Sequence, residues 1–446
     1  MLYGKQKQDV LRGIALIAKK RIGLFVSLGV VAIMVMAAFP VRASLTQETY
    51  SLWKGNSNTV AYGVYAADIV SDVTGRLEIL TAGSVYGGPA VGTLAQLKLW
   101  SWTGSTLTNV YTKEWRAGQA YTTEAYSVYA ADVDGDSTVE IVTVGYGQSQ
   151  GGSPYPEMVI WHWDGSALVS ELDLSRDSSG VFRSVYAYNI DGTGGMEIAV
   201  VGEDGSDGAL WVFNWYQGSA SLKDEETWSG TEVRARSVFI EDVGWTAAKD
   251  ILTAGYVVTG GAKYGQLRVY DYSNGALSLQ GSDTHQFLTS ATEFFSVTAA
   301  EFYSGYGKYI AACGGFGRAG VAFWNVVSGS LTHLNNADAT WPASGTAACH
   351  GVYGADIVTG SADVEVIAAG FVEVSSTDNG NIHIFNTHGG APFNTDDTYW
   401  YDNVETQAWG VYAADVDADS TVEVLSVGQS IDSNSVLWAD LRIWHV

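Results

Sequence analysis

Cysteine is nearly absent from this chain of 446 residues, since only Cys313 and Cys349 occur. Two cysteines do not make a disulfide scaffold, so the small folds that depend on several disulfides are excluded. In an exported protein the pair could form one disulfide. The other interpretation, which we favour, is two buried thiols that act as small apolar groups.

Positive charge is also scarce, with 23 Lys and Arg against 48 Asp and Glu. Seven of the basic residues and one acid lie in the first 43 positions, which leaves a net charge of −31 on the remainder. Such a surface repels phosphate backbones, so we expect no nucleic-acid partner. Cations and neutral or cationic ligands remain compatible with it.

Motifs of known chemistry are missing as well. The sequence has no Asn-x-Ser/Thr sequon, so N-glycosylation is not supported. It also has no H-E-x-x-H pair, phosphate loop, zinc-type spacing or nucleophile motif. His162 and His445 occupy the same place between aromatic residues in two copies of a repeat, which predicts a structural role for both.

One long apolar run occurs, within "KKRIGLFVSLGVVAIMVMAAFPVRAS" (19–44). Three basic residues precede an uncharged stretch over 22–39, and a small-residue site follows, which is the order of a secretory signal. We predict that residues 1–43 are this signal, cleaved after Ala43, and that 44–446 form the functional domain. The alternative is an uncleaved membrane anchor over 22–39. Either way we expect a secreted or cell-surface protein.

The rest of the chain consists of one unit repeated seven times. Copies such as "SVYAADVDGDSTVEIVTVG" (127–145) and "GVYAADVDADSTVEVLSVG" (410–428) end on a glycine and are followed by an aromatic segment such as "LKLWSW" (97–102) and a more polar one. The copies begin at Gly63, Ser127, Ser184, Ser237, Ser296, Gly351 and Gly410. Their alternating, β-branched and aromatic character predicts strands. Four short strands repeated seven times predict an all-β fold, a seven-bladed β-propeller.

The two ends of the chain predict how the propeller closes. The seventh unit stops after its third segment, and "LTQETYSLW" (45–53) is similar to "LTNVYTKEW" (107–115), the fourth segment of unit one. We therefore expect residues 45–53 to supply the outer strand of the last blade and to pair near 441–444. Closing the ring removes free sheet edges.

Two units carry alternating acids between their first two strands. The residues are Asp132, Asp134, Asp136 and Glu140 in unit two, and Asp415, Asp417, Asp419 and Glu423 in unit seven. The repeat resembles the FG-GAP/VCBS repeats of integrin-α-type β-propellers, whose loops read D-x-D-x-D-G-x-x-D. That resemblance implies calcium bound by side chains at positions one, three, five and nine, with the carbonyls of Thr138 and Thr421 at position seven. A weaker third version comprises Asn189, Asp191, Thr193 and Glu197.

Calcium takes six to eight oxygen ligands, and crowded carboxylates need a counter-charge, so the acid spacing favours calcium by itself. Against it, position six is Ser137 or Ser420 where the family has glycine, and units one, four, five and six lack one or more acids. The alternative is that Asp side chains cap the turn while the late Glu accepts from loop amides. We predict calcium in units two and seven, and leave unit three open.

A further candidate site is defined by a position in the repeat. The residue before each Ser-Val or Gly-Val is aromatic, basic or histidine: Tyr62, Tyr126, Arg183, Arg236, Phe295, His350 and Trp409. In a propeller these residues would begin the innermost strands and ring one mouth of the central channel. Aromatic faces beside planar donors suit a sugar or a carboxylate-bearing peptide. The alternative is that they only plug the channel mouth.

The leading hypothesis is therefore an exported, non-enzymatic binding or adhesion protein that recognises a glycan or a protein at this mouth, with calcium on the opposite face. An enzyme that acts on polysaccharide, a lyase or a hydrolase, would need acids at the mouth, and the seven ring positions have none. A structural subunit of a cell-surface assembly is the third hypothesis.

Overall fold

The alternating segments of the repeats form β-strands throughout the described part of the chain. The computed structural model describes residues 44–446 except 71–74, 177, 193, 217, 245–248, 290, 303–304, 306, 316, 328, 335–337, 342–345, 359–362, 387–392 and 401–403. These residues contain 29 strands and one short 3-10 helix, η1 (Phe287–Thr289). No helix among them is long and apolar enough to cross a membrane. The predicted signal and anchor, and Thr193, lie outside the described residues.

Each repeat unit contributes strands in the same order. The first strands are β2 (Thr59–Ala67), β6 (Thr122–Ala131), β10 (Gly180–Tyr188), β14 (Val233–Glu241), β18 (Phe294–Ala300), β23 (Ala347–Ala355) and β27 (Glu405–Ala414). The second strands are β3 (Glu78–Tyr86), β7 (Glu140–Gln148), β11 (Glu197–Asp204), β15 (Asp250–Thr259), β19 (Tyr309–Gly314), β24 (Glu365–Val374) and β28 (Glu423–Ile431).

The third strands carry the aromatic segments, and the fourth strands are the most polar. The third strands are β4 (Thr93–Trp102), β8 (Pro154–Trp163), β12 (Asp207–Tyr216), β16 (Ala262–Ser273), β20 (Ala319–Val327), β25 (Thr377–Asn386) and β29 (Leu437–His445). The outer strands are β5 (Leu107–Trp115), β9 (Leu168–Ser175), β13 (Ser219–Trp228), β17 (Ala276–His285), β21 (Ser330–His333) with β22 (Ala339–Trp341), β26 (Phe393–Trp400) and β1 (Thr46–Trp53).

Within a unit the strands pair as antiparallel neighbours in chain order, as in β10-β11-β12-β13 and β14-β15-β16-β17. The first two units are joined into one larger sheet by a single parallel bridge between Thr93 and Thr122. The second and third strands are almost entirely buried because both of their faces are covered by neighbouring sheets. The prediction of an all-β fold made of four-stranded antiparallel sheets is confirmed.

The N-terminal strand β1 pairs with the C-terminal strand β29, so the last sheet has the order β1-β29-β28-β27. The register places Ser51 opposite Leu441 and Gln47 opposite Trp444, as expected from the similarity of 45–53 to 107–115. Arg442 of β29 also donates to the Gln47 side chain of β1. The two ends of the described chain therefore lie in one sheet.

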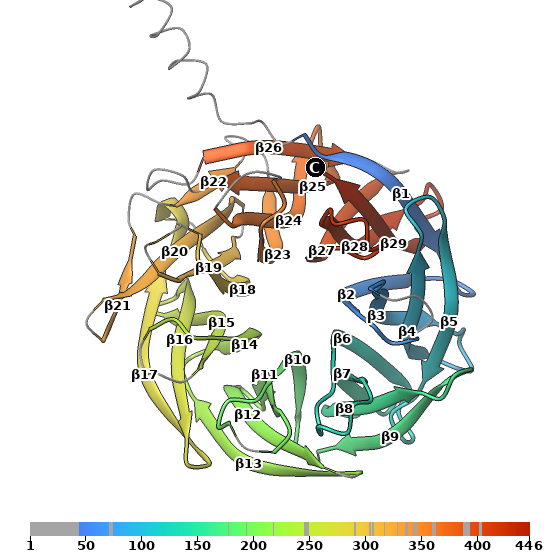
Figure 1. The fold of residues 1–446 in the computed structure, drawn as a ribbon, viewed down its shortest axis with the longest axis horizontal. Helices are drawn as coiled ribbons and strands as arrows, with labels where there is room; N and C mark the ends of the chain where they lie inside the picture. The colour runs from blue at the N-terminus through green and yellow to red at the C-terminus, as the bar shows by residue number, and fades with distance from the viewer. Residues whose placement is uncertain are drawn as a thin grey trace, which may run out of the picture. The chain divides into compact units, whose positions relative to one another are not determined.

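The first strands lie side by side around a common centre (Figure 1). They contact one another in chain order, and the last of them, β27, contacts the first, β2. The small residue that opens each repeat copy allows this approach. A Cβ on Gly63 would lie 3.1 Å from the Ser127 Cα, and the Ser127 hydroxyl in turn accepts from the Val185 amide at 3.4 Å. The Ser184 and Ser237 hydroxyls make the same bond to the next unit.

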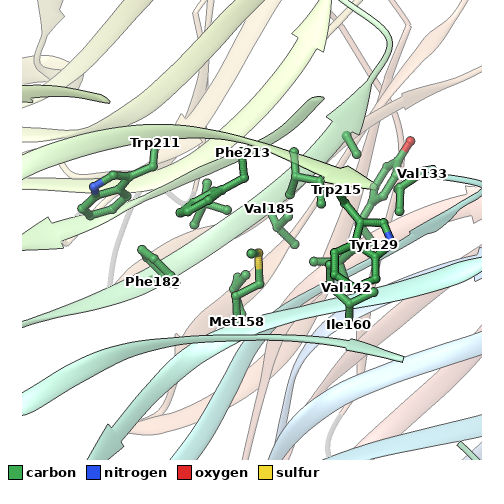
Figure 2. Close-up of a cluster of buried hydrophobic side chains, with 14 of the residues drawn as sticks. Tyr129, Val133, Val142, Met158, Ile160, Phe182, Val185, Trp211, Phe213 and Trp215 are labelled. Atoms are coloured by element: carbon green, nitrogen blue, oxygen red, sulfur yellow. The ribbon is translucent and has the colours of Figure 1, made fainter. Parts of the chain in front are cut away.

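The hydrophobic core lies between consecutive sheets. Each of the six clusters of buried side chains in the described residues takes members from two adjacent units. Figure 2 shows the cluster between units two and three, in which Met158 and Ile160 of β8 face Phe182 of β10 and Trp211 and Phe213 of β12. Burying such large side chains contributes about 1.5–3 kcal/mol each. A unit therefore depends on its neighbours for its core.

The two cysteines belong to one of these cores. Cys313 of β19 and Cys349 of β23 are free, fully buried thiols. Burial raises the pKa of the Cys313 thiol well above its ordinary value. The interpretation as buried apolar groups is confirmed.

Candidate ligand and metal sites

The seven predicted mouth residues all occupy the same structural position, a β-bulge. This bulge lies inside the first strand, since β2 begins at Thr59 and β27 at Glu405, which corrects the expectation that these residues begin the innermost strands. In every unit the pairing of the first two strands skips one residue, for example between Ala61 and Gly63 and between Ala408 and Gly410. The skipped residues, called the bulge ring below, are Tyr62, Tyr126, Arg183, Arg236, Phe295, His350 and Trp409. A bulge re-aims its side chain away from the regular alternation of the strand.

The repeated glycine stands opposite the bulge. A Cβ on Gly145 would lie 1.8 Å from the carbonyl oxygen of Glu124, and one on Gly83 would lie 1.9 Å from that of Val60. The five other repeat glycines show the same clash, at 1.8–2.0 Å. This close backbone approach explains why every copy ends on glycine.

The aromatic members of the bulge ring contact one another in series. The His350 and Trp409 rings stack with centroids 4.1 Å apart and an interplanar angle of 7°. Trp409 and Tyr126 each contact Tyr62, at 6.0 and 5.1 Å, and Phe295 contacts His350 at 5.0 Å. The structure therefore brings these five predicted residues together on one side of the ring.

The two arginines complete the ring on its other side. The Arg183 guanidinium lies over the Tyr126 ring, 4.6 Å from its centroid, and Arg236 lies 6.0 Å from the Phe295 centroid. Both arginines are tied to the same buried carboxylate. Arg183 Nε donates to Glu203 at 3.1 and 3.2 Å, and Arg236 Nη1 is 3.8 Å from it.

Acids therefore do reach this site, which corrects the expectation that it holds none. Glu203 follows the repeat glycine of unit three, while Glu124 and Glu293 lie two residues before a ring position. Glu293 pairs with Arg236 and Lys263, and Glu124 accepts from the Tyr62 hydroxyl at 3.5 Å. Sequence reasoning missed them because it examined the ring position alone. Residues two positions away on a strand share a face and were the available signal.

Burial shifts the proton equilibria of these groups. It raises the pKa of Glu124, although Tyr126 and Arg183 oppose the shift, and it raises the pKa of Tyr146 beside it to about 12. Burial and then the positive charge of Arg236 lower the pKa of His350 to about 4, against the hydrogen bond with the Ala408 carbonyl. His350 is therefore a neutral imidazole at pH 7.

The bulge ring is packed tightly. His350 is 7% exposed, and the six other residues of the bulge ring are half-buried. Two buried N–H donors of the ring, Trp409 Nε1 and Arg236 Nε, have no hydrogen-bond acceptor among the described residues. The ring is thus a continuous surface of side chains with two unsatisfied donors.

A second belt of aromatic residues, three positions further along the first strands, escaped the sequence prediction. Tyr65, Tyr129, Tyr186, Tyr353 and Tyr412 contact their neighbours with centroids 4.6–4.8 Å apart. Burial raises the pKa of Tyr129 to about 12, and the hydrogen bond with Tyr65 opposes the shift. The "VYA" of the repeat was its sequence signal.

The acidic loop of unit two brings three of its predicted ligands together. Carboxylate oxygens of Asp132, Asp134 and Asp136 lie within 4.8 Å of one another. Each also caps the turn, since Asp132 accepts from the Gly135 and Ser137 amides at 2.7 and 3.0 Å, and Asp136 accepts from the Thr138 amide at 2.7 Å.

The loop of unit seven follows the same plan. It brings together Asp415, Asp417 and Glu423, while Asp419 accepts from the Thr421 amide at 2.7 Å. Ser420, like Ser137 in unit two, has a φ of 75°. Both serines are therefore held in the left-handed region, where glycine is favoured, at a cost of the order of 1 kcal/mol each.

The late acid has a local structural role in most units. Glu140 accepts from the Val133 amide at 2.8 Å and Glu423 from the Val416 amide at 2.9 Å. Glu78 makes the same bonds in unit one, where the acidic loop is lost. Burial and the nearby aspartates raise the pKa of Glu140 to about 7 and of Glu423 to about 8.

The third acidic loop differs. Glu197 accepts from the Ile190 and Asp191 amides at 2.8 and 3.4 Å, and Asn189 Nδ2 donates to the Gly194 carbonyl at 3.5 Å. Among the described residues, Asp191 and Glu197 join no three-residue cluster of acids, histidines or cysteines. This loop is an amide-capped turn in which ligands have not converged.

A cavity of about 450 Å³ has none of its lining residues in the bulge ring. It opens beside the acidic loop of unit two and is lined by Asp134, Gly135, Asp136, Glu140, Glu171, Tyr216 and Gly218.

Comparison with known proteins yields neither a matching family model nor a matching curated protein. Among solved structures, the chain is similar to Sqt1 from Chaetomium thermophilum in two crystal structures, at 12% and 11% identity and TM-scores of 0.48 and 0.47. The alignments cover 89% and 88% of this chain and 99% and 98% of the other chains. At this identity the likeness carries no ligand or activity to the chain.

Proposed function

We propose that residues 44–446 are an exported seven-bladed β-propeller of the FG-GAP/VCBS type that binds a glycan at the bulge ring. The observation that carries the proposal is the ring itself. Seven bulges place four aromatic residues, two arginines and a histidine in one uninterrupted series of contacts. Residues on loops or bulges held by a rigid scaffold are typical positions for binding groups.

The charges around the ring favour a neutral ligand over an acidic peptide. Arg183 and Arg236 are already paired with Glu203, and Arg236 also with Glu293. An anionic ligand would have to displace buried carboxylates, at a cost of several kcal/mol. A sugar instead offers C–H faces for Tyr62 and Trp409, and its neutral hydroxyl groups leave the arginine–glutamate pairs in place.

Calcium fits the acidic loops of units two and seven by donor chemistry. Three carboxylates that converge within 4.8 Å are hard oxygen ligands, and their mutual repulsion is relieved by a divalent cation. Asp132, Asp134 and Asp136 would hold the ion in one loop, and Asp415, Asp417 and Glu423 in the other. The bound ion would supply rigidity to the ends of the first strands opposite the bulge ring.

A glycan array followed by calorimetry on the best ligand tests the binding function. Replacing Trp409 by Ala is expected to weaken binding by about 1–3 kcal/mol, the cost of removing an aromatic anchor. The matched control is Trp438→Ala, because Trp438 is also half-buried but lies in β29 outside the ring, beneath Lys54. Equal affinity of both variants and the wild type would exclude the ring as the binding site.

An enzyme that acts on polysaccharide is the second candidate, and the acids at the ring favour it. Glu124, whose pKa is raised by burial, accepts from the Tyr62 hydroxyl at 3.5 Å, and Glu203 is paired with Arg183 at 3.1 Å. Glycoside cleavage uses two carboxyl groups, one of which has a raised pKa while the other is held by polar partners. Release of reducing ends from an array-positive glycan, abolished in Glu124→Gln, would establish this function in place of simple binding.

A further inference from the structure

Two histidines and an aspartate meet on the outer strands of units four and five, outside the bulge ring and the acidic loops. His285 is the last residue of β17, His333 is the last residue of β21, and Asp338 directly precedes β22. His285 Nε2 is 2.9 Å from Asp338 Oδ2, and His333 Nε2 is 2.9 Å from Asp338 Oδ1. The cluster thus joins two sheets through three side chains.

The donor atoms have the arrangement that a tetrahedral metal ion needs. One ligand atom from each residue lies within 4.8 Å of the other two, and both imidazoles present the same nitrogen, Nε2, to the carboxylate. Zinc binds imidazole nitrogen at 2.0–2.1 Å and carboxylate oxygen at about 2.0–2.2 Å, so its ligand atoms lie about 3.3 Å apart. The observed separations need little adjustment to reach that value.

Aromatic neighbours hold both imidazoles in place. The two histidine rings are 4.2 Å apart at an interplanar angle of 37°. Phe287 and Trp324 contact the His285 ring edge-on at 5.2 and 6.2 Å, and Trp324 also lies 5.1 Å from His333. The side chains of His285, His333 and Asp338 remain 16%, 11% and 22% exposed, which leaves a route for an ion from solvent.

The cluster lies where an outer strand is interrupted. In unit five β21 and β22 both pair with β20, β21 opposite residues 324–327 and β22 opposite residues 319–321. His333 ends the first piece and Asp338 precedes the second. A metal ion bound by His333 and Asp338 would connect β21 to β22 at the interruption of the outer strand. Its bond to His285 would join them to unit four.

We propose that His285, His333 and Asp338 form a structural binding site for a divalent transition-metal ion, with Zn²⁺ as the expected occupant and water as the fourth ligand. Two imidazoles and one carboxylate are ligands of zinc-type ions, whereas calcium prefers oxygen alone. On binding, each imidazole coordinates the ion through its Nε2 lone pair and keeps one proton on Nδ1, so a neutral ring that held its proton on Nε2 changes tautomer and an imidazolium releases one proton to solvent. Without an ion, the same residues form a His-Asp-His clip.

The test is calorimetric titration of the chain from Ser44 with Zn²⁺ in excess Ca²⁺, repeated with Co²⁺ as a spectroscopic probe. One equivalent of Zn²⁺ should bind and raise the melting temperature, since an ion that binds only the folded state stabilises it. Four-coordinate Co²⁺ should give intense visible absorption that Zn²⁺ abolishes. The variants His285→Ala and Asp338→Asn should lose both the bound equivalent of Zn²⁺ and the visible absorption of bound Co²⁺.

The matched control is His162→Asn, because His162 contacts a single carboxylate, that of Glu171, at 2.7 Å. It should keep full Zn²⁺ binding. Circular dichroism in chelator separates loss of the site from loss of the fold, and Asp338→Asn retains a side chain that can still bond both histidines. If the wild type binds no Zn²⁺, or if both site variants still bind one equivalent of Zn²⁺, the three residues form only an ion-paired cluster and the proposal is wrong.

Discussion

At the scale of single residues, the repeat glycine and the bulge residue form one device. The glycine lets the second strand approach the carbonyl that precedes the bulge, and the bulge then turns a large side chain toward its neighbours in the ring. Any side chain at the glycine would push the two strands apart. The ring residues recur before Ser-Val or Gly-Val in the sequence because the backbone bulge occurs at that position in every unit.

Replacing Gly145 by Ala tests this device. The new Cβ would lie 1.8 Å from the Glu124 carbonyl oxygen, so we expect a loss of unfolding free energy of about 2–4 kcal/mol, which chemical denaturation would measure. Gly152→Ala is the control, because its Cβ would meet Ser149 alone, at 3.3 Å from the Ser149 Cβ and 3.5 Å from its carbonyl oxygen. Similar losses in both variants would contradict the argument from close approach.

His350 makes the stability of the ring depend on pH. Burial and Arg236 lower its folded pKa to about 4, below the ordinary value of 6.5. The unfolded chain therefore binds a proton below about pH 6.5 that the folded chain excludes, so stability falls between about pH 6.5 and pH 4.

The expected size is about 2 kcal/mol between pH 7.5 and pH 5, in addition to the contribution of other groups. His350→Phe should be less stable near neutral pH, because the Ala408 carbonyl loses its 2.9 Å partner, but should lose less stability on acidification. Urea unfolding at the two pH values measures the difference. Parallel losses in variant and wild type would show that His350 titrates normally in the folded state.

The sequence alone predicted the residues of the bulge ring but not the glutamates that lie beside them. Tyr62, Arg183 and Trp409 recur at one repeat position, so counting along the sequence was enough to group them. Glu124 lies two residues upstream of Tyr126 on the same strand, but Glu203 comes from a different strand, and only the cross-strand register brings it beside Arg183. Register depends on the bulge, which shifts the pairing by one residue and which alternation alone does not reveal.

At the scale of elements, strand β1 has a role that its position in the chain does not suggest. It covers the outer edge of β29 over Thr46–Trp53, and its Gln47 accepts from Arg442. Arg442 and Asp440 are a buried pair at 2.8 Å, only 3% and 4% exposed. Without β1 this pair and the backbone of β29 would face solvent.

Deleting residues 45–53 should therefore do more than shorten the protein. An uncovered strand edge is a template for pairing with a second chain, so we expect both a lower melting temperature and concentration-dependent association. Light scattering and calorimetry measure the two effects. A monomeric deletion variant with unchanged melting temperature would mean that β1 is an accessory strand.

Elements were predictable where the repeat is regular and unpredictable where it is broken. The similarity of 45–53 to 107–115 identified β1, because an outer strand has the same polar alternation in every unit. The division of the fifth outer strand into β21 and β22 has no counterpart in the other units, so comparison between copies could not find it. The His285–His333–Asp338 cluster depends on that division and was missed with it.

At the scale of the whole folded unit, the acidic loops follow the ends of the first strands, whereas the bulge ring lies within those strands. Tyr126 and Asp132 are six residues apart along β6 and its loop, or about 20 Å at the rise of an extended strand. The strands between them are held by the tyrosine belt and by the serine bonds between units. Calcium should therefore stabilise the fold without changing the affinity of the ring.

This separation gives a prediction with two measurements. Chelation should lower the melting temperature of the wild type and added calcium should restore it, because an ion bound only to the folded state stabilises by mass action. The double variant Asp134→Asn with Asp417→Asn should lose this response and keep its glycan affinity.

Asp164→Asn is the control for this prediction. Asp164 caps a turn by accepting from the Ser166 and Ala167 amides at 2.8 Å, so its loss should cost stability equally with and without calcium. If calorimetry detects no calcium binding to the wild type at millimolar concentration, the acidic loops are amide-capped turns in all units. If calcium binds but also changes glycan affinity, the acidic loops and the bulge ring are coupled and the rigid-strand argument is wrong.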